Sequence, residues 1–66
     1  MNSDYEVVFR QDPDGVWLAE VPALPGCHTY GETLDEARAH IRDAVALWLE
    51  SDEFTLSELV VEPKAS

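Results

Sequence analysis

One long helical segment constrains the fold of this chain more than any other feature of its sequence. Thr33, followed three residues later by Glu36, forms a capping box, in which each side chain satisfies the other residue's free backbone N–H. No Gly or Pro interrupts the chain from there to about Ser51. One helix face collects the apolar residues at three- and four-residue spacing, namely Leu34, Ala37, Ile41, Ala44, Val45 and Trp48. A single helix of this kind can cover only one face of a sheet.

The rest of the chain is typical of short strands and turns. Residues 5–10 and 16–21 alternate in hydrophobicity, and the intervening QDPDG has strong turn chemistry, so the two segments form an antiparallel hairpin. The PALPG segment at 22–26 is a rigid connector, because its two prolines remove two backbone donors. Residues 27–30 and 58–62 complete the strands, and the final KAS is expected to fray.

This order of elements predicts an α+β fold with the sequence β-β-β-α-β. We expect a single antiparallel sheet with the helix packed on one of its faces. A chain of 66 residues holds one domain at most, which we place at residues 1–66. Cys27 is the only cysteine, so an intramolecular disulfide cannot support this small domain.

Alternation along the strands also predicts which residues lie on the uncovered face of the sheet. The residues assigned to the helix-facing side are Tyr5, Val7, Phe9, Trp17, Ala19 and Val21. Val8, Val16 and Leu18 then lie on the opposite face. Exposed aliphatic surface on so small a domain favours a homo-oligomer, either a dimer or a tetramer. The alternative is a set of scattered surface hydrophobic residues, which are common in soluble proteins.

The charge balance restricts the partners that this chain can bind. Fourteen Asp and Glu residues outnumber four Lys and Arg residues, which gives a formal net charge of -10. Such a chain repels nucleic-acid backbones and anionic membranes, so we expect no direct binding to either. A basic partner protein is favoured, because complementary potentials steer association. Alternatively, the acidic residues only keep a small protein soluble.

The sequence shows no targeting segment. Its first residues lack the basic and apolar regions of a signal peptide. No stretch approaches the roughly 20 apolar residues of a membrane span. Together with the lone thiol, these features predict a cytoplasmic protein.

Residues with catalytic side chains do not form a convincing site. Cys27 and His28 are adjacent on an expected strand, so their side chains point to opposite faces and cannot form a thiolate–imidazole pair. Glu36, His40 and Asp43 lie close to one helix face at a spacing that could hold a metal, but no further ligand pair accompanies them. We therefore expect no catalytic residue, no cofactor and no metal.

The same helix face is a candidate docking surface for a basic protein. Three acidic residues seven positions apart form a stripe, because seven residues are close to two helical turns. His40 and Leu47 lie along its edge, and the alternative is an ordinary solvated helix face. With the acidic hairpin turn included, the candidate contact residues are Asp12, Asp14, Glu36, His40, Asp43, Leu47 and Glu50.

Three motifs in the right order give the chain a resemblance to a known family. Residues 14–17 match a D-G-aromatic hairpin, residues 21–27 match a V-P-x-L-P-G-C connector, and residues 31–37 match a G-[DE]-T-x-x-E-A helix start. The run over residues 14–50 thus resembles the N-terminal domain of HicB-type antitoxins. The resemblance covers more than half of the chain.

The resemblance implies a degenerate RNase H-like or double-stranded-RNA-binding-like fold. It also implies binding of a small basic RNA-cleaving toxin of the HicA type, whose active site the antitoxin occludes. Antitoxins of this family usually continue into a C-terminal DNA-binding domain, and we expect none here. The leading hypothesis is therefore an antitoxin-like binding module that is not an enzyme. The alternatives are a self-assembling structural domain without a toxin partner, and a small metal-dependent enzyme using Glu36, His40 and Asp43.

Overall fold

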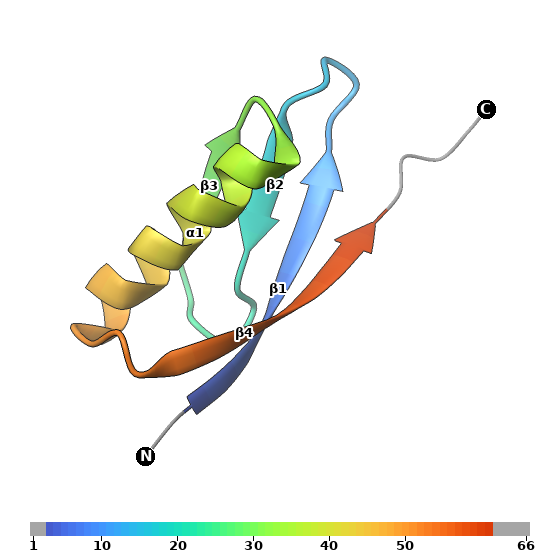
Figure 1. Cartoon of the computed structure of the whole chain (residues 1–66). Helices are drawn as coiled ribbons and strands as arrows, with labels where there is room; N and C mark the ends of the chain where they lie inside the picture. The colour runs from blue at the N-terminus through green and yellow to red at the C-terminus, as the bar shows by residue number, and fades with distance from the viewer. Residues whose placement is uncertain (1–2, 62–66) are drawn as a thin grey trace.

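The computed structural model describes residues 3–61, which form a four-stranded sheet with one helix across one face (Figure 1). The predicted order of elements is confirmed. The elements are β1 Ser3–Gln11, β2 Trp17–Glu20, β3 His28–Gly31, α1 Leu34–Leu49 and β4 Phe54–Val61.

The sheet is mixed, so the prediction of a single antiparallel sheet is wrong. Its strand order is β3-β2-β1-β4, in which β1 pairs antiparallel with β2 but parallel with β4. The cause is the single helix between β3 and β4. Two reversals leave β3 running in the direction of β1, and α1 then returns the chain to the end where β1 starts. Phe54 consequently pairs with Ser3, and β4 runs alongside β1 in the same direction.

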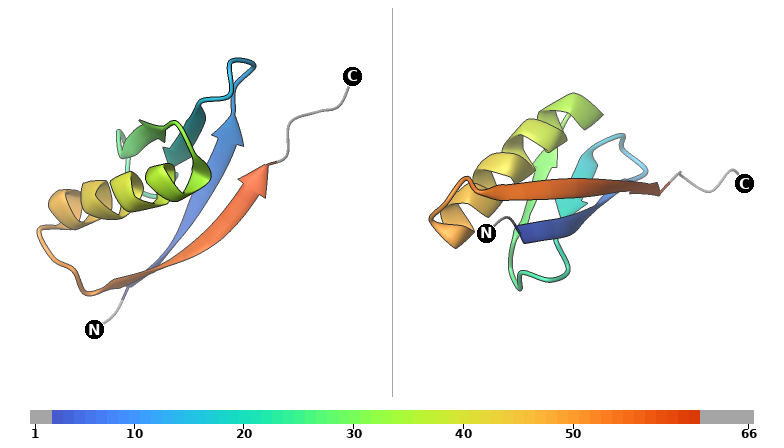
Figure 2. Two further views of the ribbon diagram at one scale, coloured as in Figure 1. Left: turned by 45° about the horizontal axis from the view of Figure 1, so that its top comes forward. Right: turned by 60° about the horizontal axis from the view of Figure 1, so that its bottom comes forward.

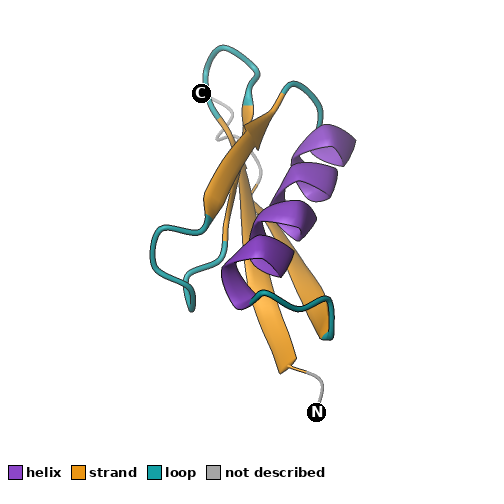
Figure 3. Ribbon diagram, turned by 90° about the vertical axis from the view of Figure 1, so that its left-hand side faces the viewer, coloured by secondary structure: helices purple, strands orange, loops and turns teal. Residues whose placement is uncertain are grey.

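The helix α1 lies across one face of the sheet (Figure 3). The hydrophobic core fills the space between them. It consists of Val7, Phe9, Ala19, Val21, Leu24, Cys27, Ala37, Ile41, Val45 and Phe54. The strand residues predicted to face the helix are therefore buried or packed against the core, with Tyr5 and Trp17 partly covered at its margin. Burying a large aliphatic or aromatic side chain contributes roughly 1.5–3 kcal/mol, so this cluster holds the helix on the sheet.

Trp48 departs from its predicted place in the core. Its side chain is 49% exposed, although it follows the helical spacing of the buried residues. The helix packs mainly over β2 and β3, which have only four residues each (Figure 2). The end of α1 therefore lies over the PALPG connector instead of the sheet. There the Trp48 Nε1–H donates to the backbone oxygen of Pro25 at 3.3 Å.

The ends of α1 follow recognisable capping patterns. Thr33 Oγ1 accepts a hydrogen bond from the Glu36 backbone N–H at 3.1 Å, as the capping box predicts. The Glu36 carboxylate instead accepts from the Glu32 backbone N–H, also at 3.1 Å, one residue earlier than expected. The helix ends at Leu49, before the predicted end near residue 51, because Glu50 adopts a left-handed conformation with φ 54°.

The last strand begins four residues earlier than predicted. Phe54 is buried and belongs to the core, so it anchors the start of β4 against the sheet. The predicted strand end at residue 62 and the predicted frayed tail lie outside the described residues.

Candidate functional site

The outer face of α1 presents the acidic stripe predicted from the sequence, which we define as Glu36, His40, Asp43, Leu47 and Glu50. All five residues are exposed. Leu47 is the most exposed large hydrophobic residue of the described chain, at 80%. An isolated exposed leucine is common in itself, but this one lies between Asp43 and Glu50 on a single helix face.

Two members of the acidic stripe already have structural roles. The Glu36 carboxylate caps the helix through the Glu32 N–H. His40 Nδ1 lies 2.7 Å from the backbone oxygen of Tyr30, and a carbonyl oxygen only accepts, so Nδ1 carries the proton. Within residues 3–61, the Asp43 carboxylate makes no such hydrogen bond or ion pair, and the Leu47 side chain is exposed. These two residues, with Glu50, are thus the members of the stripe that remain available to a partner.

The end of α1 carries more negative charge than the sequence prediction included. Glu50, Asp52 and Glu53 follow the last turn, and no basic residue lies in that turn. The carbonyl end of a helix is itself the negative end of its dipole, where acidic side chains are unfavourable. Glu50 also adopts a backbone conformation that favours glycine. The sequence shows these acidic residues at 50–53. The structure adds that they lie at the carboxyl end of a helix, where no basic residue offsets their charge.

The hairpin turn does not join this acidic region. The β1–β2 turn lies at the end of the molecule where α1 starts, whereas Leu47 and Glu50 belong to the opposite end of the helix (Figure 1). Asp12 is also engaged, since its Oδ1 accepts from the backbone N–H groups of Asp14 and Val16 at 2.9 and 3.0 Å. The seven candidate contact residues therefore form two groups, not one surface.

Two arginines of α1 lie on the side away from the acidic stripe. Arg38 Nη1 donates to Asp35 at 2.7 Å, and its Nε donates to the two carboxylate oxygens of Glu58 at 3.0 and 2.9 Å. These carboxylates raise the pKa of Arg38. The Arg42 guanidinium lies 5.4 Å from the Phe54 ring centroid, a cation–π contact. Because both cations face β4, neither neutralises the stripe.

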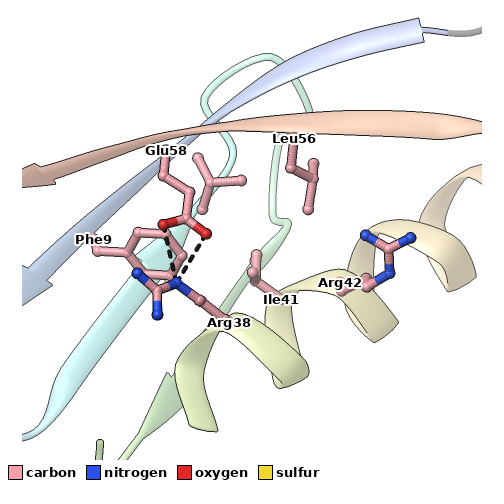
Figure 4. Close-up of a pocket in the computed structure, with 7 residues that line it drawn as sticks. Phe9, Arg38, Ile41, Arg42, Leu56 and Glu58 are labelled. Atoms are coloured by element: carbon pink, nitrogen blue, oxygen red, sulfur yellow. Dashed lines mark hydrogen bonds and ion pairs between the residues drawn. The ribbon is translucent and has the colours of Figure 1, made fainter. Parts of the chain in front are cut away.

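A shallow pocket lies between α1 and β4, and both arginines line it (Figure 4). Its volume is about 220 Å³, and the Arg38–Glu58 ion pair lies across it. The lining residues are Val7, Phe9, Arg38, Ile41, Arg42, Leu56 and Glu58. The pocket is a gap between the helix and the less covered half of the sheet.

The geometry does not support a metal site or a cysteine nucleophile in the part of the chain described. Among residues 3–61, no three His, Cys, Asp or Glu side chains come together in a way that could hold a metal ion, so the trio of Glu36, His40 and Asp43 is not such a group. Cys27 is buried, and burial raises the pKa of its thiol. His28 is exposed and packs edge-on against Tyr30. In addition, α1 is too short and too polar to cross a bilayer, and it is the one helix within residues 3–61.

Comparison with known proteins identifies the family. Residues 5–64 match the model of the HicB-like antitoxin of bacterial toxin–antitoxin systems. A UPF0150 protein of Archaeoglobus fulgidus is 41% identical over 46 residues, covering 70% of this chain and 67% of the relative. A UPF0150 protein of Thermoplasma acidophilum is 45% identical over 47 residues, covering 71% and 68%. One from Synechocystis sp. is 40% identical over 50 residues, covering 76% and 72%.

No solved structure matches the chain significantly. The family model spans nearly the whole sequence, and these relatives are at least 40% identical to it over 46 to 50 residues. The chain therefore belongs to the HicB-like antitoxin family.

Proposed function

We propose that this chain is an antitoxin-like module that sequesters a small basic RNA-cleaving toxin of the HicA type. The observation that carries the proposal is the exposed Leu47 within uncompensated negative charge at the end of α1. Family membership supplies the class of function, and the helix surface supplies a place where a basic protein would dock. By binding the positive surface through which an RNase contacts RNA, the chain would block RNA binding.

The proposed contact combines long-range steering with a short-range apolar anchor. A net charge of -10 attracts a basic protein and raises the association rate, an effect that falls as salt screens it. Charge at the rim of an interface contributes mainly to rate and specificity. Leu47 adds the apolar contact, and its full burial would contribute roughly 2 kcal/mol.

The carboxyl end of α1 is the favoured centre of this docking surface. Glu50, Asp52 and Glu53 add their charge to the negative end of the helix dipole, which costs stability when the chain is alone. A basic partner would place positive charge beside these carboxylates and so relieve their repulsion by the helix dipole and by one another. By contrast, Asp12 uses its carboxylate to hold the hairpin turn, so we assign it a structural role.

The test is titration of a purified HicA-type toxin with this chain, followed by calorimetry and by an RNA-cleavage assay. We expect stoichiometric inhibition of cleavage in 0.05 M salt and a much weaker complex in 0.5 M salt. The variants Leu47→Ala and Asp43→Asn/Glu50→Gln should each weaken binding by about tenfold. The matched control Glu6→Gln/Glu20→Gln loses the same charge from exposed residues of β1 and β2 and should bind nearly as tightly as the natural chain.

Equal weakening by both double variants would show that net charge alone matters and would remove the assignment to the helix surface. If the toxin cleaves RNA unimpeded by an excess of the chain in low salt, the proposed function itself is wrong.

A further inference from the structure

The sheet face opposite α1, where the oligomer interface was predicted, is mixed in character in the described part of the chain. The strand register places Glu20 beside Val8 and His28 beside Glu20 on this face. Val8 is buried at 8% exposure, and Val16 and Leu18 are partly buried. Charged and polar groups therefore interrupt the apolar side chains of this face, and it gives no specific support to self-association.

Trp48 presents an exposed aromatic side chain at the carboxyl end of α1, next to Leu47 in the chain. About half of its side chain is exposed, at 49%. Its Nε1–H donates to the Pro25 backbone oxygen, which ties the indole to the PALPG connector. An indole has no second hydrogen-bonding group, so what it offers to a partner is the apolar, electron-rich ring. Tryptophan is also among the residues that most often dominate the binding energy of protein interfaces.

The backbone at this end of α1 leaves two hydrogen-bond acceptors open. The N–H groups of Glu50 and Ser51 donate to carbonyl oxygens of the last turn, at 3.3 and 3.1 Å, and so close the helix. Among the hydrogen bonds within residues 3–61, none reaches the next two carbonyl oxygens, those of Trp48 and Leu49. These oxygens form the negative end of the helix dipole and can accept from a donor on a partner.

The charge around this helix end selects the kind of donor. Glu50, Asp52 and Glu53 follow the last turn, which contains no basic residue. A guanidinium group suits this combination, because it is positive, stacks on aromatic rings and directs its N–H donors to oxygen acceptors in its own plane. A lysine ammonium is a compact, strongly hydrated charge that stacks less well. The end of α1 should therefore prefer arginine to lysine.

We propose that the carboxyl end of α1 binds an arginine side chain of its basic partner, which stacks on the Trp48 ring and donates to the oxygens around it. This inference rests on the proposed function for the identity of the partner. It adds which side chain of that partner is recognised, and it makes Trp48 a contact residue beside Leu47. The sequence pattern assigned Trp48 to the core instead.

The experiment compares hexa-arginine with hexa-lysine, two peptides of equal charge, in calorimetric titrations of the full chain in about 0.1 M salt. Both peptides are attracted by the acidic residues, and we expect hexa-arginine to bind more tightly. The variant Trp48→Leu should lower this preference, the ratio of the two dissociation constants, by about threefold, as the loss of an exposed cation–π contact predicts. In a proton–nitrogen NMR spectrum, hexa-arginine should shift the Trp48 indole signal more than that of Trp17.

Tyr30→Leu is the matched control, because it removes another exposed aromatic side chain, on β3, and should leave the preference unchanged. Trp48→Phe keeps a ring and should retain part of the preference. Thermal unfolding of each variant establishes that it is folded. A preference that Trp48→Leu does not lower, or that Tyr30→Leu lowers equally, overturns the proposal.

The same variants in the toxin titration separate this inference from the proposed function. Trp48→Leu should weaken toxin binding by about threefold, and Tyr30→Leu should not. A toxin that binds the natural chain and Trp48→Leu equally well would show that its contact does not use this ring, although the proposed function would stand. If the toxin binds neither, the proposed function is wrong, and the peptide titrations alone decide whether the helix end recognises arginine.

Discussion

Gly31, the last residue of β3, lies directly beneath the Ala37 backbone in the first turn of α1. A Cβ built on Gly31 would come within 2.9 Å of the Ala37 Cα and closer still to its backbone nitrogen. Because these atoms belong to the backbone, they cannot move aside as a flexible side chain would. This contact sets how closely the start of the helix approaches the sheet.

Gly31→Ala should therefore destabilise the domain by about 3 kcal/mol, as overpacking of a tight contact does. That is a large share of the roughly 3–10 kcal/mol available to a domain of this length. The control Gly26→Ala adds a Cβ at φ 82° but meets no neighbouring atom, so it should cost only about 1 kcal/mol of backbone strain. Urea unfolding followed by circular dichroism measures both, and equal losses would refute the steric account.

A second prediction concerns Glu50, the left-handed residue after α1. Glu50→Gly should stabilise the domain by about 1 kcal/mol, because glycine adopts this conformation without strain and a carboxylate leaves the negative end of the helix. Glu50→Gln removes only the charge and should gain a few tenths of a kcal/mol. Both should weaken toxin binding. Thermal unfolding and toxin titration of the same samples compare the two effects, and a loss of stability in Glu50→Gly would contradict the argument.

The sequence predicted the local features of this fold and missed those that depend on distant segments. The helix cap at Thr33 and the β1–β2 hairpin are set by neighbouring residues, and the structure confirms them. The other half of the capping box differs, since Glu36 bonds to the Glu32 N–H, and Val8 is buried where alternation predicted an exposed residue. The parallel pairing of β4 with β1 was missed, because it joins segments about 50 residues apart through one helix. Trp48 was misplaced because its burial depends on how far the strands beneath it extend.

The candidate site shows the same division between local and distant information. Helical spacing correctly grouped Asp43 and Leu47 on one exposed face. It could not show that Asp12 and Asp14 lie at the other end of the molecule, because that follows from the direction of the hairpin relative to α1. Nor could helical or strand spacing show that Arg10 of β1 lies between Leu18 of β2 and Val61 of β4, because this depends on the register of three strands.

The buried thiol of Cys27 predicts a loss of stability at alkaline pH. Burial raises the pKa of Cys27 above its unfolded value of about 8.5, so at high pH the unfolded chain releases a proton that the folded chain retains. The contribution to stability is complete below the unfolded pKa and is lost as pH rises through the folded pKa. Urea titrations under reducing conditions from pH 7.5 to 9.5 should show a steeper decline for the natural chain than for Cys27→Ala. Parallel declines would show that the thiol is not the titrating group responsible.

The last prediction concerns the Arg38–Glu58 ion pair, which bridges α1 and β4 across the pocket. The side chains are 42% and 37% exposed, and an ion pair so accessible to water contributes about 1 kcal/mol or less. Glu58→Gln should therefore cost under about 1 kcal/mol, since Arg38 keeps Asp35. Glu58→Leu should be neutral or slightly stabilising, because the new side chain would lie against Ile41 and Leu56 in the pocket. Urea unfolding in low and high salt separates the electrostatic contribution of the ion pair, which salt screens, from the apolar contribution of the leucine, which salt does not screen. A loss above about 2 kcal/mol in both variants would mean that this ion pair, not the apolar core, fixes β4 against the helix.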